Sequence, residues 1–261
     1  MYPKPSSSRL KLRYAPLLSA VIFVAASTFA FSAPPDRSAL LIDDFSAETL
    51  DAAPTGWKKL LLPRKKKETR YTVVRDGENK VLKAESSGAA SAVYKEFKGD
   101  ELKDLEILSW RWKVGGVLGK GDETRKDGDD YAARIYVTFE YEPEKTSSFD
   151  KFKFKLLDAF YGIKAPGNAV NYIWANKLKK GEAIKNPFTD RVVMVAVESG
   201  AELTGQWLNE ERNIYEDYRK FFKDTPPRIT GVVIMTDTDN TNESAVGYYD
   251  DIVLKRGSGI K

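Results

Sequence analysis

The chain has 261 residues, with 42 basic and 38 acidic side chains and neither cysteine nor histidine. The missing cysteine excludes disulfides, thiol nucleophiles, cysteine–zinc sites and a lipid-modified N-terminal cysteine. The missing histidine excludes the serine–histidine–acid triad, histidine–zinc sites and the commonest general base. Any catalysis must therefore use Asp, Glu, Tyr, Lys or Arg.

The N-terminal segment has the layout of a secretory signal peptide. Arg9, Lys11 and Arg13 precede an uncharged apolar run over residues 17–31. This run is shorter than the roughly 20 residues that a membrane-spanning helix needs. Small residues follow it, so residues 1–32 are expected to be removed on export; an uncleaved anchor is the alternative. Since no lipobox cysteine is present, the expected location is the periplasm or the exterior.

The expected mature chain, residues 33–261, is electrically neutral. Residues 1–33 contain four basic and no acidic side chains, which leaves 38 charges of each sign. The basic run at residues 64–67 lacks interleaved aromatic residues and is interpreted as a solvated loop. We therefore expect no nucleic-acid partner. No later stretch is apolar for long enough to insert into a membrane after cleavage.

The mature chain reads as short strands separated by turns. Strands are predicted, in chain order, at residues 39–45, 70–74, 91–97, 105–114, 131–140, 169–175, 191–198, 229–237 and 245–254. Alternation is strict in two of them, which indicates one buried and one wet face. The predicted buried faces carry Leu108, Trp110, Trp112 and Val114 in one strand, and Tyr131, Ala133, Ile135, Val137 and Phe139 in the other.

Two segments carry a helical pattern. Residues 207–222 place Leu208 and Tyr215 near one side, and Pro226 lies beyond the end of the predicted helix. Residues 149–162 fit either a helix or a strand. About nine strands and one clear helix predict a mainly β fold: a single antiparallel, jelly-roll-like β-sandwich domain with one or two helices.

The two ends of the mature chain resemble the carbohydrate-binding jelly rolls of the galactose-binding-like and concanavalin-like groups. The opening LIDDFSAETLDAAPTGW and the closing GYYDDIVL each carry paired aspartates, at Asp43-Asp44 and Asp250-Asp251. In jelly rolls the first and last strands often lie side by side. Some of these carboxylates are therefore expected to approach each other, and a structural calcium ion held by Asp44 and Asp251 is a hypothesis.

The middle of the chain resembles an exported bacterial family, domain of unknown function 3047. The resemblance rests on SWRWKV, DDYAARIYV, NYIWANKL, NPFTDR, QWLNEERNIYEDYRKFF and MTDTDNT, followed by YYDDI. It spans residues 40–254. That family has no established activity, so the resemblance implies no catalytic residues.

An acidic stretch follows the predicted strand at residues 229–237. If the strand continues, period two puts Asp237 and Asp239 on one face, with Asn240 beside them. Calcium prefers several oxygen ligands, which Asp and Asn supply, so Asp237 and Asp239 are candidate calcium ligands although EF-hand spacing is absent. Ordinary turn formation, direct contact with a ligand and a glycosidase carboxylate pair are the alternatives.

Further polar and aromatic residues are candidates for contact with a ligand. Arg134 shares the wet face of its strand with Asp130, where an ion pair within a hairpin is the structural alternative. Trp174 shares a side with Val170 and Tyr172, which favours a core role over stacking on a sugar ring. The candidate ligand-binding residues are Arg134, Asn171, Trp174, Arg191, Trp207, Arg212, Asp237, Asp239 and Asn240.

These features favour an exported, non-catalytic binding protein for a glycan, a cell-envelope component or a similar polar ligand. A polysaccharide hydrolase or lyase is the first alternative, and a lyase without histidine needs tyrosine as its base. The residues available for it are Tyr131, Arg134, Tyr136, Asn171 and Arg191. A structural envelope protein that acts through a partner is the second alternative. The ligand and the oligomeric state stay open, and calcium is the one cofactor considered.

The signal-peptide interpretation predicts a shortened product. Cleavage is expected after Ser32, with Ala30 at position −3, or after Ala30, with Thr28 at position −3. Amino-terminal sequencing of the protein recovered from envelope or culture fractions should therefore begin at Ala33 or Phe31. A cytosolic product that retains its first residue would contradict the interpretation.

Overall fold

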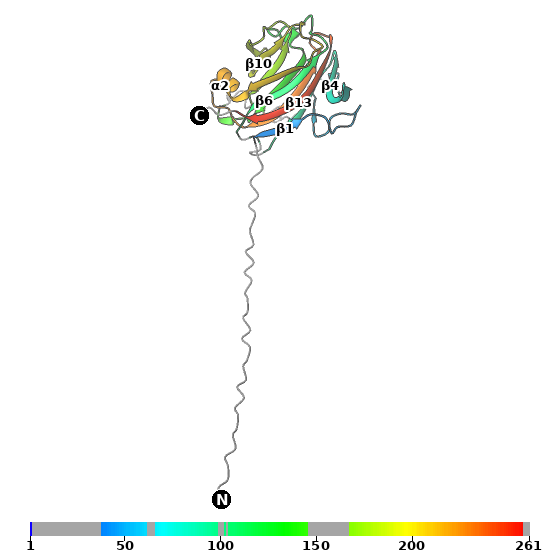
Figure 1. Ribbon diagram of the computed structural model, residues 1–261. Helices are drawn as coiled ribbons and strands as arrows, with labels where there is room; N and C mark the ends of the chain where they lie inside the picture. The colour runs from blue at the N-terminus through cyan, green and yellow to red at the C-terminus, as the bar shows by residue number, and fades with distance from the viewer. Residues whose placement is uncertain (2–37, 62–65, 99–101, 103, 146–166, 258–261) are drawn as a thin grey trace. The chain divides into compact units, whose positions relative to one another are not determined.

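The computed structural model describes residue 1 and residues 38–257, except for 62–65, 99–101, 103 and 146–166. The described strands form two sheets (Figure 1). In the six-stranded sheet, the strand order is β11 (Leu208–Asn213), β6 (Leu105–Val114), β13 (Ser244–Arg256), β4 (Asn79–Ser87) and β3 (Arg70–Asp76). The sixth strand, β1 (Ala39–Asp43), pairs with β13. The seven-stranded sheet runs β2 (Lys58–Leu61), β5 (Ala90–Glu96), β12 (Ile229–Asp237), β7 (Tyr131–Phe139), β8 (Ala169–Ala175), β10 (Thr189–Ser199), β9 (Ala183–Asn186).

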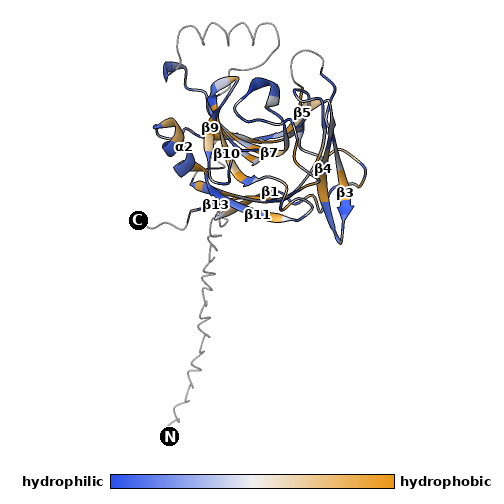
Figure 2. Cartoon of the chain, turned by 90° about the horizontal axis from the view of Figure 1, so that it is seen from above, coloured by the Kyte–Doolittle hydropathy of each residue, from blue (hydrophilic) through white to orange (hydrophobic). Residues whose placement is uncertain are grey.

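The predicted mainly β sandwich is confirmed. Figure 2 separates the two layers, with β5, β7, β9 and β10 in one and β1, β11 and β13 in the other. Apolar side chains that alternate along the strands meet between the layers. There the ring of Trp110 lies 5.3 Å from that of Tyr172, and Trp112 lies 5.9 Å from Trp174. This aromatic packing joins the six-stranded sheet to the seven-stranded sheet.

The two layers approach closely near Gly247 of β13. A Cβ atom at this position would lie 2.5 Å from the backbone oxygen of Ala132 and 2.9 Å from the hydroxyl of Thr236. Any larger side chain would therefore force the sheets apart. The hydroxyl of Thr236 also donates to the oxygen of Ala132 at 2.9 Å, so the start of β7 is held against the end of β12.

All nine predicted strands are found, but four observed strands have no counterpart among them. Three predicted strands have the observed bounds (105–114, 169–175 and 229–237), and the other six differ by one or two residues at an end. The strands without a predicted counterpart are β2, β4, β9 and β11. One strand pair departs from the predicted antiparallel arrangement, since β8 and β10 run parallel.

The predicted helix at residues 207–222 is too long at its start. Residues 208–213 form β11, which pairs with β6, and the helix α2 (Ile214–Phe222) begins after Asn213. The side chain of Asn213 caps it by accepting hydrogen bonds from the backbone N–H groups of Tyr215 and Glu216. Pairing with the sheet overrides the helical pattern here. Residues 149–162, predicted as helix or strand, lie outside the described residues.

The helix α2 contacts strands of both sheets, β6 and β11 of one and β8 of the other. Ile214 and Tyr218 are buried in the core, and the ring of Tyr218 lies 4.5 Å from that of Phe139. Two short 3-10 turns, η1 (Lys126–Gly128) and η2 (Pro143–Lys145), flank β7. Within the described residues, no helix has both the length and the apolar character for crossing a membrane.

The predicted buried face of residues 131–140 is correct except at its first residue. Ala133, Ile135, Val137 and Phe139 belong to the core between the sheets, as predicted. Tyr131 instead packs with Ile173 and Met194 on the other face of the seven-stranded sheet. The register between β7 and β12 shifts between Met235 and Asp237, and this irregularity breaks the alternation at the start of β7.

Candidate functional site

The seven-stranded sheet has an outer face, which is the face turned away from the six-stranded sheet. Strand alternation brings Arg134 and Tyr136 of β7 onto this face. Met235 of β12 and Asn171 of β8 lie on it as well: Met235 is paired with Arg134, and Asn171 with Tyr136. Neighbouring strands therefore gather polar side chains where a sandwich normally meets water.

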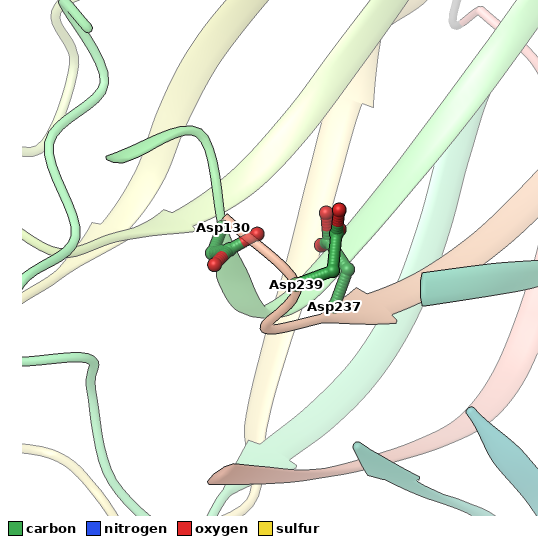
Figure 3. Close-up of side chains that lie close together, drawn as sticks. All are labelled: Asp130, Asp237 and Asp239. Atoms are coloured by element: carbon green, nitrogen blue, oxygen red, sulfur yellow. The ribbon is translucent and has the colours of Figure 1, made fainter. Parts of the chain in front are cut away.

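Three carboxylates meet where β12 ends and β7 begins. Each of Asp130, Asp237 and Asp239 offers an oxygen, and these oxygens lie within 4.8 Å of one another. Figure 3 shows the side chains of Asp237 and Asp239 side by side, with Asp130 opposite them. The predicted proximity of Asp237 and Asp239 is therefore observed, and Asp130 joins them from the position just before β7. We call these three residues the acidic cluster.

Hydrogen bonds from the loop after β12 hold the acidic cluster in place. The carboxylate of Asp130 accepts from the backbone N–H of Thr241 at 2.6 Å, and from the backbone and side chain of Asn240 at 3.3 and 3.1 Å. Asn240 was a candidate ligand contact, but here it fastens the loop. Lys66 forms an ion pair with Asp239. Part of the basic run at 64–67 thus takes part in the site, contrary to its interpretation as a solvated loop.

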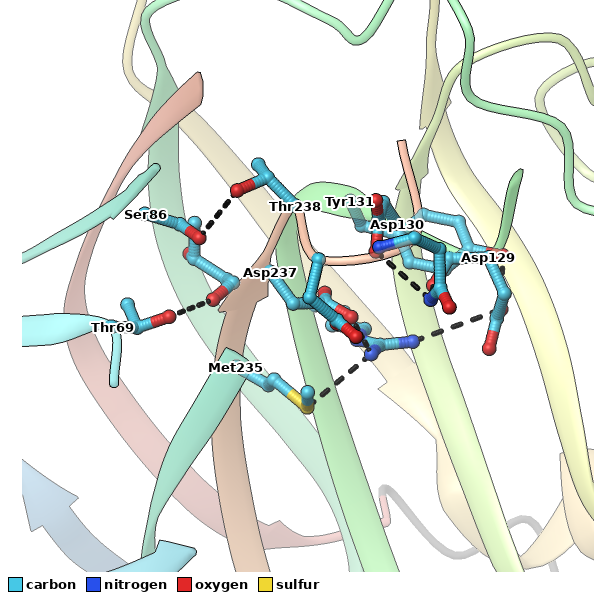
Figure 4. A network of polar contacts seen from close by, with 12 residues as sticks. Thr69, Ser86, Asp129, Asp130, Tyr131, Met235, Asp237 and Thr238 are labelled. Atoms are coloured by element: carbon cyan, nitrogen blue, oxygen red, sulfur yellow. Dashed lines mark hydrogen bonds and ion pairs between the residues drawn. The ribbon is translucent and has the colours of Figure 1, made fainter. Parts of the chain in front are cut away.

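Arg134 is buried beside the acidic cluster, with 3% of its surface exposed. Its guanidinium forms an ion pair with Asp237, and a second at 3.8 Å with Asp129 (Figure 4). It lies over the rings of Tyr131 and Tyr136, at 4.8 and 5.4 Å from their centroids. The predicted pairing of Arg134 with Asp130 is wrong, because Asp130 turns to the loop at 240–241 instead.

Burial and charge act in opposite directions on the ionisable groups around Arg134. Burial raises the pKa of Asp237 against the opposing pull of Arg134, and the neighbouring Asp130 and Asp129 raise it further. For Arg134 itself, burial would lower the pKa, but the surrounding groups, with Asp237 first among them, together more than offset this and the pKa rises. Burial also raises the pKa of Tyr136. The guanidinium is thus charged, while the phenol of Tyr136 is protonated near neutral pH.

Several buried polar atoms on this outer face lack hydrogen bonds within the described part of the chain. They are Nε and Nη1 of Arg134, Oδ1 of Asp237, and both the oxygen and the nitrogen of the Asn171 side chain. Buried polar groups in proteins are nearly always satisfied, by protein or by water or a ligand. Among the described residues, these atoms therefore have the capacity for a further hydrogen bond.

A groove of about 780 Å³ crosses the outer face of the seven-stranded sheet next to Arg134. Tyr136 and Met235 line it, and both contact the guanidinium, the methionine sulfur at 3.3 Å. The walls also carry Tyr141, Arg191, Arg228 and Thr230. An ion pair of 3.0 Å joins Arg228 to Glu140, and Arg191 lies over the ring of Tyr141 at 5.8 Å. Aromatic, apolar and charged groups thus converge in one groove.

The remaining ligand candidates lie elsewhere. Trp174 is fully buried between the sheets and donates to the oxygen of Gly200, so it presents no free ring face and its place among the ligand contacts is wrong. Trp207 lies under Arg111 at 4.8 Å and beside Tyr248, on strands of the six-stranded sheet. Arg212 pairs with Asp217 at 2.5 Å. Neither Trp207 nor Arg212 lines the groove.

The terminal strands pair as predicted, but their aspartates do not form a cluster. β1 and β13 are antiparallel neighbours. The carboxylate of Asp44 accepts hydrogen bonds from the backbone and hydroxyl of Ser46, and Asp251 pairs with Arg111 at 2.9 Å. Within the residues that the structure describes, the acidic cluster is the one group of three ligand-bearing side chains close enough to share a metal ion. Among the described residues, Asp44 and Asp251 belong to no such group, and other partners hold each of them.

Sequence reasoning missed a second pair of carboxyl groups, at the side of the sandwich. Glu210 of β11 accepts from the indole of Trp112 at 3.2 Å, and Glu198 of β10 pairs with Lys180. Burial, and then the charge of Glu198, raise the pKa of Glu210 to about 7. No sequence signal links these two glutamates, because strands of different sheets carry them.

Fold and site together define a two-sheet β-sandwich protein with a groove across the outer face of one sheet. The family model described as "Protein of unknown function (DUF3047)" matches residues 55–253, and the chain belongs to this family. No curated protein matches the chain.

Among solved structures, the chain is similar to carbohydrate-binding modules of Clostridium thermocellum. One is the family 11 module of the cellulosomal cellulase Lic26A-Cel5E, at 11% identity and a TM-score of 0.43, covering 84% of this chain and 95% of that one. Another is the family 30 module of the cellulase Cel9D-Cel44B, at 10% identity and a TM-score of 0.36, covering 84% and 99%. Likeness at this level carries no inference about the site.

Removal of the buried guanidinium should strongly destabilise the fold. The change Arg134→Met leaves Asp237 and Asp129 without their cation, and we expect a loss of about 3–5 kcal/mol in the free energy of unfolding. Arg125→Met is the matched control, because Arg125 pairs with Asp127 at the surface, where solvent screens the pair and its loss should have little effect on stability. Urea unfolding measures both, and equal losses would contradict the structural role given to Arg134.

The raised pKa of Glu210 predicts a pH dependence of stability. Because the folded state holds this proton more tightly than the unfolded state, the free energy of unfolding should fall as pH rises from 4.5, the ordinary pKa of a glutamate, to about 7. Since Glu210 is partly exposed, we expect a fall on the order of 1 kcal/mol.

Two variants isolate this contribution in urea unfolding between pH 5 and 8. Glu210→Gln should flatten the profile relative to wild type. Glu211→Gln, the neighbouring exposed glutamate that pairs with Lys255, should leave it unchanged. A wild-type profile that parallels that of Glu210→Gln would rule out the raised pKa.

Proposed function

We propose that the groove on the outer face of the seven-stranded sheet binds a glycan or a similar polar ligand of the cell envelope without catalysing a reaction on it. The observation that supports this most is the groove itself. Its volume of about 780 Å³ lies within the range of roughly 300–1,000 Å³ typical of small-molecule sites.

The lining of the groove has the mixture of groups that a sugar ring requires. A sugar presents apolar C–H faces, which pack on aromatic rings, and hydroxyl edges, which need hydrogen-bond partners. Tyr136 and Tyr141 supply partly exposed rings. Arg191, Arg228 and Thr230 supply donors, and the threonine hydroxyl can also accept. The polar groups stand on strands or next to them, which favours a fixed arrangement.

A binding role suits the ionisable groups better than catalysis does. A lyase would use Tyr136 as its base, but burial raises the pKa of Tyr136, so the phenol holds its proton at neutral pH. A hydrolase would use Asp237 and Asp239, yet Asp237 is paired with Arg134 and Asp239 with Lys66. The parts of the lyase hypothesis do gather here, since Tyr131, Arg134, Tyr136 and Asn171 share the outer face, but they lack a free base.

The proposal places the protein outside the cytoplasm, in the periplasm or beyond it, where envelope and extracellular polysaccharides occur. This proposed location depends on the signal-peptide pattern of residues 1–32.

The proposal predicts saturable binding that depends on the groove. The purified protein should bind at least one member of a panel of neutral β-glucans, xylan, polyuronates and muropeptides in isothermal titration calorimetry. Tyr141→Ala and Arg191→Ala should each weaken that binding about tenfold or more, because each removes a side chain that lines the groove.

The matched control is Tyr248→Ala. Tyr248 is also a partly exposed tyrosine, but it lies beside Trp207 on the six-stranded sheet, away from the groove. The Tyr248→Ala variant should bind the polysaccharide like the wild type. Flat titrations across the panel would overturn the proposal, as would losses that are equal in all three variants. Release of reducing ends or unsaturated products from a bound polysaccharide would show an enzyme instead.

A further inference from the structure

The acidic cluster has the chemistry of a cation site, separate from the groove. We infer that Asp130, Asp237 and Asp239 together bind a divalent cation of the calcium type. The inference goes beyond the proposed function, because it concerns a different ligand held by residues that do not line the groove.

The donor atoms and their spacing fit calcium. All three side chains offer carboxylate oxygens, which are the ligands that hard cations prefer. Two oxygens bound to one Ca²⁺ at about 2.4 Å can stand up to about 5 Å apart, while the shorter Mg²⁺ distance of about 2.1 Å allows only about 4 Å. The oxygens of the acidic cluster lie within 4.8 Å of one another, so each pair of them falls within the separation that two calcium ligands can have.

The charges around the acidic cluster do not balance. Asp129, Asp130, Asp237 and Asp239 contribute four carboxylates, whereas Arg134 and Lys66 are the cations paired with them in the described part of the chain. Carboxylates that are packed this closely repel one another unless a cation lies between them. A divalent ion supplies the two positive charges that the side chains lack.

A buried oxygen atom within the cluster points to the same conclusion independently. Asp237 is 1% exposed, and within the described residues its Oδ1 has no hydrogen-bond partner. In Figure 3 its carboxylate lies beside that of Asp239. The hydroxyl of Thr241 is likewise buried without a partner, and the backbone of Thr241 is bonded to Asp130. An ion at the cluster would give Asp237 Oδ1 the partner that it lacks.

Lys66 is the natural competitor of the ion. Its ammonium group pairs with Asp239, and 173 positions separate the two residues in the chain. The ammonium group of Lys66 and a divalent ion would compete for the carboxylate of Asp239. Calcium binding should therefore loosen the contact between Lys66 and Asp239, and loss of the ammonium should favour the ion.

Calcium chloride is the probe, added to protein that has first been treated with EGTA and dialysed. Titration calorimetry should show saturable binding. At a free concentration near one hundred times the Kd, the melting temperature should rise by about 5–10 °C. Asp239→Asn should weaken binding at least tenfold, because it removes one charged ligand, while Asp237 keeps its contact with Arg134.

Two further variants show whether calcium binds at the acidic cluster or elsewhere on the protein. Asp44→Asn removes a carboxylate that is held by Ser46 at the terminal strands, and it should bind calcium like the wild type. Lys66→Met keeps the acidic cluster intact and removes the competing ammonium, so it should bind calcium several times more tightly.

The inference fails if chelation and calcium leave the wild-type melting temperature unchanged and calorimetry shows no binding. It also fails if Asp44→Asn abolishes the response while Asp239→Asn retains it, since the ion would then lie at the terminal strands. Weaker binding by Lys66→Met would equally overturn it. These results do not depend on a glycan, so failure of the groove proposal and failure of the cation site can be told apart.

Discussion

A charged guanidinium buried in protein must be matched by carboxylates, and the polar site of this molecule depends on that constraint. Arg134 obtains its partners from two directions, Asp237 at the end of β12 and Asp129 just before β7. The pairing fixes these segments relative to each other. Tyr136 and Met235 contact the same guanidinium, so the wall of the groove takes its position from the ion pair.

The two faces of the seven-stranded sheet contribute in different ways. Its inner face is apolar, with Ile135 and Val137 of β7 packed in the core between the sheets. Such packing tolerates exchange among apolar residues of similar volume. The outer face carries Arg134 and Asn171, whose hydrogen bonds need exact partners and lose most when one partner is missing. The inner face therefore mainly supplies stability, and the outer face carries the polar groups on which the proposed binding depends.

Period-two alternation was enough to find a strand whose side chains divide between core and surface, residues 105–114. It failed where a neighbouring strand decides the conformation. Residues 208–213 have a helical pattern but pair with β6, and the parallel pairing of β8 with β10 has no signature in either segment alone. The register shift that moves Tyr131 to the outer face is likewise a property of the strand pair, not of one strand.

The same dependence on neighbouring strands explains which candidate residues lie together in the fold and which do not. Neighbouring acidic residues made both Asp44 and Asp237 candidate ligands, because the sequence shows only which carboxylates are close along the chain. In the fold, Oδ1 of Asp44 accepts from the backbone and the hydroxyl of Ser46, two positions away. Asp237 instead lies at the end of β12, facing the carboxylates of Asp239 in the following loop and of Asp130 just before β7. One of its oxygens has no donor in the described chain. Whether a carboxylate is available for recognition is decided by the donors around it, and distant segments such as the one carrying Lys66 supply those donors only once the sheets have formed.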